Sequence, residues 1–327
     1  MFFLPPPPPP PTHTHYTGKN SNPKSLSFRK LHWNYRDLYL LLLVPVVYVI
    51  VFNYIPMYGV VMAFKNYQPM KGVWGSPWVG FYHFQRFFTS PNFVNIIRNT
   101  LVLSVYGLIA GFPFPIILAV FVNHSRLFAV KKAVQSVTFA PYFISMVILV
   151  GLVVQILGMR TGGVNVLLSK LGFDEINFMG SPAAFPHIYV WSGVWQATGY
   201  SAIIYISTLA AVDPNLHEAA LIDGATLWQR VWHIDLCTIR PIIVIMLILS
   251  MGGILGGNFE KIYLMQTPQN TSVSEVIVTY VYKVGLIASR PDFSFGTAIG
   301  LFQNVVGVIL TLAVNRIAKA LTGNSMF

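Results

Sequence analysis

Six long apolar segments alternate with polar ones along this chain of 327 residues, and they limit what it can fold into. A helix that crosses the hydrocarbon core of a bilayer needs about 20 consecutive, mainly apolar residues. Charged residues make up only 9% of the sequence, against roughly 25% in soluble domains. We therefore predict an all-α, polytopic membrane protein. Its six transmembrane helices are expected at about 38–63, 98–122, 134–157, 186–210, 241–257 and 294–315.

The segment before the first apolar stretch predicts the orientation of the chain. It contains a proline run, Pro5 to Pro11, and several basic residues but no acidic one. Proline runs favour an extended, solvated chain, and an excess of Lys and Arg marks cytoplasmic segments. We expect 1–36 to be a disordered, Pro-rich cytoplasmic tail and 37–327 to be the transmembrane domain. Six spans then place both termini in the cytoplasm.

The formal net charge of +11 does not predict a nucleic-acid partner. A nucleic-acid surface gathers Lys and Arg on one face or along one helix, whereas here the basic residues are scattered and many flank the apolar segments. The partner that this distribution predicts is the lipid bilayer. The single cysteine, Cys237, excludes an intramolecular disulfide.

No pattern of a catalytic or metal-binding site stands in the sequence. Its eight histidines are dispersed, no H-E-x-x-H is present, and no Ser/His/Asp set follows from the spacing. The phosphate-binding loop G-x-x-x-x-G-K-[ST] is also absent, so this chain does not bind ATP in that manner. We therefore predict no catalytic residue, no metal and no cofactor in this chain.

A polar loop, about 211–240, separates the fourth and fifth apolar segments. Asp213 is a good helix N-cap because its carboxylate accepts from free backbone N–H groups. Pro214 suits the first helical position, where no N–H is required. We predict a short helix over 214–223 that ends at Gly224, because glycine adopts the left-handed conformation at low cost.

This predicted helix combines small and acidic residues. Ala219 and Ala220 allow another protein to approach closely, while Glu218 and Asp223 offer charges for pairing. A short, stiff helix of this kind is expected where a partner must move the membrane domain; a helix lying on the lipid headgroups is the alternative. A second amphipathic segment follows and leads to Pro241, which is expected to open the fifth span.

The same loop resembles the signature of ABC importer permeases. In that family the loop forms a coupling helix, which sits in a cleft of a cytoplasmic ATPase. The run DGATLWQRVWHIDL, followed by IRP, is similar to the oligosaccharide-importing subgroup related to the maltose permeases, and FKNYQP and WVGFYHFQRFF at 64–69 and 78–88 extend the resemblance. Two departures are Cys237, where proline is usual, and Val231, where phenylalanine is frequent. The matching residues are Glu218, Ala219, Ala220, Asp223, Gly224, Ala225, Ile234, Leu236 and Pro241.

The resemblance implies a permease subunit of an ATP-driven importer in the bacterial cytoplasmic (inner) membrane. Its implied partners are a second homologous permease, two copies of a cytoplasmic ABC ATPase that binds ATP and Mg, and an extracytoplasmic solute-binding protein. The implied substrate is an oligosaccharide, with alginate as the specific suggestion. The residues implied to couple the chain to the ATPase are Glu218, Ala219, Ala220, Asp223, Gly224 and Ala225.

Polar and aromatic side chains in or near the spans are candidates for the substrate path. Polar groups in a membrane are costly and usually face a cavity or the protein interior, and tryptophans offer faces on which a sugar can stack. The alternative is that Asn and Gln form ordinary hydrogen bonds between helices. The candidates are Trp191, Trp195, Gln196, Tyr200, Asn258, Glu260, Gln303 and Asn304.

Two other classes of protein compete with the permease. A secondary sugar transporter would need ionisable residues inside the spans as ion or proton relays, and the central spans contain almost none. A membrane-embedded enzyme would need acids or histidines clustered near one face, and the sequence shows no such cluster.

Overall fold

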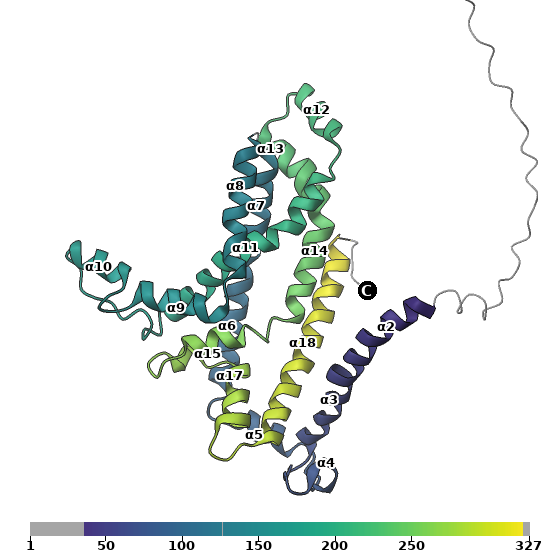
Figure 1. Ribbon diagram of the computed structural model, residues 1–327, viewed down its shortest axis with the longest axis vertical. Coiled ribbons are helices and arrows are strands. Elements are labelled where there is room, and N and C mark those ends of the chain that lie inside the picture. Colours follow the sequence, from purple (N-terminus) through teal and green to yellow (C-terminus); the bar gives the residue numbers. More distant parts are fainter. Residues whose placement is uncertain (1–35, 126, 323–327) are drawn as a thin grey trace, which may run out of the picture. The chain divides into compact units, whose positions relative to one another are not determined.

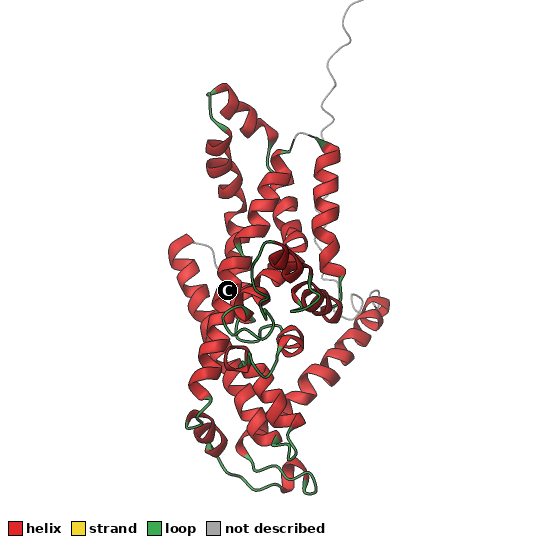
Figure 2. Ribbon diagram, turned by 90° about the vertical axis from the view of Figure 1, so that its left-hand side faces the viewer, coloured by secondary structure: helices red, strands yellow, loops and turns green. Residues whose placement is uncertain are grey.

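The computed structural model describes residues 36–125 and 127–322, which form helices joined by turns. Within these ranges the backbone contains no strand, only an isolated bridge between Lys65 and Trp78, and Figure 2 shows helices and loops alone. The all-α class is therefore confirmed. The predicted disordered tail lies outside the described residues, apart from Arg36. The chain divides into two compact units, 1–58 and 59–327, and each is described by itself.

The described part of the first unit is one helical run. It begins with α2 (Arg36–Val49), continues through the π-helix η1 (Ile50–Tyr54) and reaches α3 (Ile55–Met57). Pro56 has no N–H to donate, and the wider π turn before it is one way in which a helix accommodates such an interruption.

The second unit carries the rest of the helices (Figure 1). The helix η2 (Tyr58–Phe64) crosses the boundary between the units. The helices that follow are α4 (Gly72–Gly75), α5 (Tyr82–Phe88), α6 (Phe93–Gly111), α7 (Pro113–His124), α8 (Phe128–Phe139), η3 (Ala140–Phe143), α9 (Met146–Leu157), α10 (Gly163–Lys170), α11 (Phe185–Ala210), α12 (Pro214–Ile222), α13 (Leu227–Arg230), η4 (Val231–Asp235), α14 (Leu236–Gly252), α15 (Phe259–Met265), α16 (Thr271–Ser274), α17 (Ile277–Tyr282), η5 (Lys283–Ile287) and α18 (Phe293–Thr322).

Four helical segments in the described part of the chain are long and apolar enough to cross a membrane. They are Leu38–Phe64, Phe93–His124, Leu227–Gly252 and Phe293–Ala320. The predicted span at 134–157 is instead a pair of helices bent by 101° between Phe143 and Met146. The predicted span at 186–210 corresponds to α11, which has 26 residues but is not among the four segments. The count of six spans therefore stays a prediction.

The prediction for Pro241 was wrong. This proline does not open a span but lies inside α14, and α13, η4 and α14 form one helical segment of 26 residues. A proline inside a helix removes the hydrogen bond to the carbonyl four residues earlier, here that of Cys237. Ile239 and Val244 are buried on either side of it, so packing holds the helix together across the interruption.

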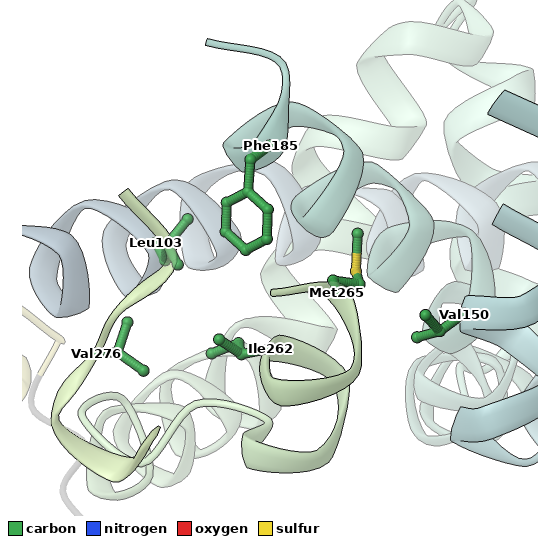
Figure 3. Packing of buried hydrophobic residues seen from close by; sticks show 6 residues of the cluster. All are labelled: Leu103, Val150, Phe185, Ile262, Met265 and Val276. Carbon is green, nitrogen blue, oxygen red and sulfur yellow. The ribbon is translucent and has the colours of Figure 1, made fainter. Parts of the chain in front are cut away.

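The core of the second unit is built around α11, which packs along α6 and α7 and also against α8. At one end of α11, Phe185 meets apolar side chains from four other parts of the chain (Figure 3). This cluster joins α6, α9, α11, α15 and the residue that caps α17. It consists of Leu103, Val150, Phe185, Ile262, Met265 and Val276. It fixes α15 against α11, which matters for the site described below.

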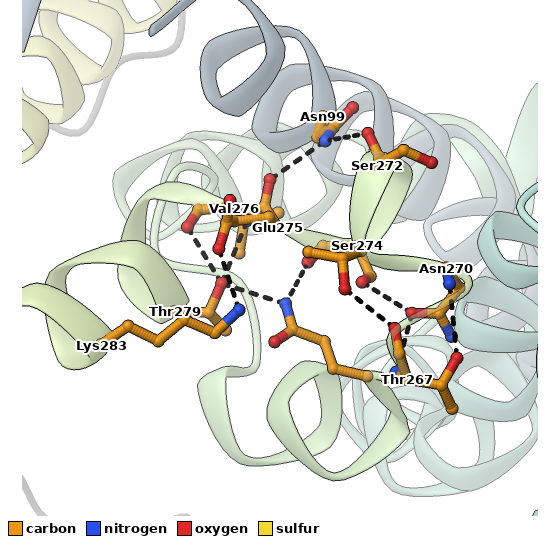
Figure 4. Close-up of polar contacts among 11 residues, drawn as sticks. Asn99, Thr267, Asn270, Ser272, Ser274, Glu275, Val276, Thr279 and Lys283 are labelled. Carbon is orange, nitrogen blue, oxygen red and sulfur yellow. Dashed lines mark hydrogen bonds and ion pairs between the residues drawn. The ribbon is translucent and has the colours of Figure 1, made fainter. Parts of the chain in front are cut away.

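A polar network holds the segment from α15 to η5 against α6 (Figure 4). The Nδ2 atom of Asn99 in α6 donates to the carbonyl oxygens of Ser272, at 2.9 Å, and Glu275, at 3.1 Å. The Nζ atom of Lys283 donates to Oε1 of Glu275 at 2.9 Å. Because buried polar groups are costly unless they are hydrogen-bonded, these bonds fix the position of the loop.

Candidate functional site

The start of α12 agrees with the sequence prediction. Asp213 is the N-cap, and its Oδ1 atom accepts from the backbone N–H of Asn215 at 3.0 Å. Pro214 occupies the first turn, and the helix ends at Ile222, one residue before the predicted end. The capping chemistry of the loop therefore determined this helix locally.

The end of α12 explains the spacing of its small residues. Gly224 has a φ of +81°, a left-handed conformation that costs other residues energy. The N–H of Ala225 donates to the carbonyl of Ala220 at 2.8 Å, and that of Gly224 donates to Leu221 at 3.1 Å. These two bonds form a Schellman motif. A capping box between Thr226 and Gln229 then starts α13.

The helix α12 presents large apolar side chains to its surroundings. None of its residues is buried, and Ile222 is 87% exposed. In the adjoining segment, Trp228 is 70% exposed and Trp232 is also exposed. The two motif acids, Glu218 and Asp223, are exposed as well. An exposed apolar surface with polar groups beside it is typical of a contact with another protein or with a membrane.

A buried carboxylate ties α12 to the helices behind it. Asp235 in η4 has a side chain with 0% exposure. Its Oδ2 atom lies 2.6 Å from Nε2 of His124, the last residue of α7. Its Oδ1 atom lies 3.4 Å from Nε2 of His217 in α12. An ionised carboxylate only accepts hydrogen bonds, so His124 is the donor to Asp235. Three helical elements thus meet at one side chain.

Sequence reasoning missed this contact. The ring of His217 faces Asp235 and lies edge-on to that of His124, with 5.8 Å between the ring centres. The one available signal was an aspartate between Ile234 and Leu236, inside the apolar pattern of the second segment. His124, 111 residues before Asp235, gave no signal.

A cavity of about 390 Å³ lies beside α11. Its walls come from α6, α7, α9, α11, α14 and α15, and its volume is within the range of ligand-binding pockets. Among the described residues that line it there is no Asp or Glu and one charged residue, Lys261. Among its polar lining residues are Gln196, Ser201, Ser250 and Asn258.

Lys261 is buried without an acidic partner. Its side chain belongs to α15, and the residue is 3% exposed. Its Nζ atom donates to the carbonyl of Tyr189 in α11 at 2.8 Å and lies 5.1 Å from the centre of the Tyr189 ring. No ion pair with Lys261 occurs between residues that the structure describes. No local sequence signal points to Lys261, because a lysine in a loop between spans is usually solvated.

The structure brings together only some of the predicted substrate-path residues. Gln196 and Asn258 line the cavity with Lys261, although Gln196 also donates to the Ile144 carbonyl and Asn258 caps α15. Gln303 and Asn304 line a different cavity, of about 590 Å³, beside α18. The remaining candidates are exposed and line neither of these two cavities: Trp191, Trp195, Tyr200 and Glu260.

Two of these exposed aromatic residues have partners within the chain. The Nε1 atom of Trp191 donates to the hydroxyl of Tyr106 at 2.9 Å. The ring of Tyr200 stacks on that of Tyr142, with 3.8 Å between the ring centres. Both contacts explain these aromatics by packing, and their role in a substrate path stays a prediction.

The geometry can be compared with known proteins. The family model described as "Binding-protein-dependent transport system inner membrane component" matches residues 111–323. The polygalacturonan/rhamnogalacturonan transport system permease protein YteP of Bacillus subtilis (strain 168) is 41% identical over 301 residues, 92% of each chain. Protein LplB of the same organism is 40% identical over 290 residues, 89% of this chain and 91% of LplB.

Two solved structures are also similar. One is of a bacterial ABC transporter involved in the import of the acidic polysaccharide alginate, with a TM-score of 0.82 and 38% identity over 90% of this chain and 99% of that chain. The other is of a bacterial alginate ABC transporter in complex with an alginate pentasaccharide-bound periplasmic protein. Its TM-score is 0.83 and its identity 37%, over 91% and 99% of the two chains.

Proposed function

Because this chain belongs to the family of binding-protein-dependent transport system inner membrane components, we propose that separate ATPase subunits drive it through α12. The chain is the permease subunit of a sugar ABC importer. Neither alternative, a secondary transporter or a membrane-embedded enzyme, has support among its relatives, which are transport permeases. In the proposed complex, two cytoplasmic ATPases bind ATP and Mg, and a second homologous permease completes the pathway.

The observation that carries this proposal is the geometry of α12. It is a capped helix of nine residues with no buried residue, and it exposes Glu218, Ala219 and Asp223. A cleft of a partner would cover this surface, and Ala220 to Ala225 would keep the helix at a fixed angle to α13. The buried Asp235 contact would pass its movement to α7 and α14. Alternating access would follow as rocking of the spans.

We further propose that the cargo is an acidic oligosaccharide, with alginate as the specific candidate. Support comes from the two similar structures, whose transporters import the acidic polysaccharide alginate or bind an alginate-loaded periplasmic protein. In this arrangement a solute-binding protein delivers the sugar from outside. With the six predicted spans, the chain crosses the membrane several times and has both termini in the cytoplasm.

The coupling step is tested by charge reversal on α12. The variant Glu218→Lys is compared with Asn215→Lys, which adds a positive charge at an exposed position of the same helix outside the motif. Exposed substitutions change stability by about 0.5 kcal/mol or less, so both variants should fold and insert. We expect Glu218→Lys alone to lower sugar uptake per ATP hydrolysed in proteoliposomes. Normal uptake by Glu218→Lys would contradict the proposal.

The partners are tested by purification from the native membrane. A tagged copy of this chain should bring down an ATPase and a second permease. Uptake of sugar by the purified chain alone, without ATP, would contradict the ABC importer assignment.

A further inference from the structure

The most unusual charged group in the described residues is the ammonium of Lys261. Taking an ammonium group out of water is costly unless an opposite charge and hydrogen bonds compensate for it. Here the residue is 3% exposed, and the compensation consists of one carbonyl oxygen and one aromatic ring, both of Tyr189. An ammonium has three N–H donors, and the Tyr189 carbonyl accepts from one of them. The others can donate to a bound anion.

The position of this charge in the cavity suits a ligand that carries the anion. Lys261 lines the cavity together with hydroxyl and amide groups of Gln196, Ser201 and Ser250, and within the described part of the chain no acidic residue lines it. Sugar hydroxyls need such donors and acceptors, and a sugar carboxylate needs the cation. The cavity walls therefore match an acidic sugar better than a neutral one.

A small residue leaves room for the ammonium. A Cβ atom on Gly193 of α11 would lie 3.1 Å from Nζ of Lys261, closer than ordinary van der Waals contact. Glycine at this position lets the lysine lie against α11 and reach the cavity. A side chain at this position would press against the charged group and require it to shift.

From these observations we infer that Lys261 binds a carboxylate of the acidic oligosaccharide as it passes through the cavity beside α11. This inference depends on the proposed function, since it names the group of this chain that recognises the charge of the cargo. The competing explanation is purely structural: Lys261 would only tie α15 to α11 through the Tyr189 carbonyl.

The test compares Lys261→Met with Lys261→Arg in the whole complex, with the second permease, the ATPases and the binding protein, reconstituted in proteoliposomes. The probe is an alginate trisaccharide at saturating binding protein, and uptake is normalised to the amount of assembled complex. We expect Lys261→Met to lower kcat/KM for uptake by about tenfold or more, the range for loss of a charge-assisted hydrogen bond. Lys261→Arg should retain much more activity because it keeps the charge. Equal losses in both variants would overturn the inference.

A second probe separates charge recognition from structure. In the carboxyl-reduced trisaccharide the carboxylates are replaced by alcohols, so Lys261→Met should no longer be at a disadvantage against the unsubstituted complex. An equal loss for both probes would overturn the inference. If the unsubstituted complex does not import the reduced sugar, the comparison of Met with Arg decides.

The matched control is Lys65→Met. Lys65 is another buried lysine, 9% exposed, and its Nζ atom also donates to backbone carbonyls, those of Val73 at 2.9 Å and Trp74 at 3.2 Å. It does not line the cavity beside α11, so its loss should lower thermal stability and leave substrate preference unchanged. Failure of the unsubstituted complex to import alginate oligosaccharides would contradict the proposed cargo. Normal import by Lys261→Met in an active complex would contradict only the role of Lys261.

Discussion

The buried contact at Asp235 gives the sharpest prediction about how α12 is held. The substitution Asp235→Ala removes the acceptor for His124 of α7 and the contact with His217 of α12. Both histidines then keep polar nitrogens in a partly buried site without their partner. We expect the end of α7, α12 and η4 to lose their fixed arrangement, while the long apolar helices keep theirs.

The magnitude follows from the two distances. The bond of 2.6 Å from His124 to a fully buried carboxylate is a hydrogen bond to a charged group, which contributes about 1.5–3 kcal/mol. Removing one member of a buried pair costs roughly 3–5 kcal/mol. The His217 contact is longer, at 3.4 Å, and adds less. We therefore expect Asp235→Ala to destabilise the local structure by about 3 kcal/mol.

The assay is hydrogen exchange of the α12 backbone in the assembled complex. A loss of about 3 kcal/mol corresponds to roughly a hundredfold larger population of the open state, and exchange in Pro214–Ile222 should accelerate accordingly. Asp235→Asn should have a smaller effect, because its amide oxygen can still accept from His124. His217→Phe should have the smallest effect, because it removes only the longer contact.

Unchanged exchange of α12 in Asp235→Ala would show that the buried carboxylate does not hold this helix. If His217→Phe accelerated exchange as much as Asp235→Ala does, the shorter bond to His124 would carry none of the stability.

Two further predictions concern glycines. Gly199→Ala should destabilise the protein by about 3 kcal/mol, the upper range for overpacking. The reason is that the added Cβ atom would lie 2.1 Å from the Thr138 carbonyl oxygen. The control is Gly151→Ala, where an added Cβ atom meets nothing within 4 Å, so the melting temperature should stay unchanged or rise. Gly224→Ala should lower the free energy of unfolding by about 1–2 kcal/mol, because position 224 has a left-handed backbone, and it should lower uptake per ATP hydrolysed. Gly224→Asn should be better tolerated. Equal behaviour of the two variants would contradict the role of the backbone conformation.

The helix α12 could be predicted from the sequence because its determinants are local. Asp213, Pro214 and Gly224 act on backbone groups within a few residues of themselves, and the structure confirms the cap, the first turn and the left-handed end. The resemblance of the same residues to a permease signature predicted the family, which the relatives confirm. Coupling to an ATPase through these residues stays a prediction.

The long helices were only partly predictable. Apolar composition located most of the candidate spans, because a helix in lipid needs a long apolar run whatever it packs against. Composition does not record direction, so the bend of 101° before Met146 was missed. The same limit applies to Pro241, which ends a helix in isolation but lies within α14, where its neighbours are packed.

The helical class, the apolar segments, the capped loop helix and the family could be predicted without a structure, since each depends on neighbouring residues or on composition. The burial of Lys261 and the contact by which Asp235 joins α7 to α12 became visible only in the folded chain. Lys261 contacts Tyr189, 72 residues earlier, and Asp235 contacts His124, 111 residues earlier. Burial and pairing at such separations depend on how the helices pack, and no local pattern records that packing.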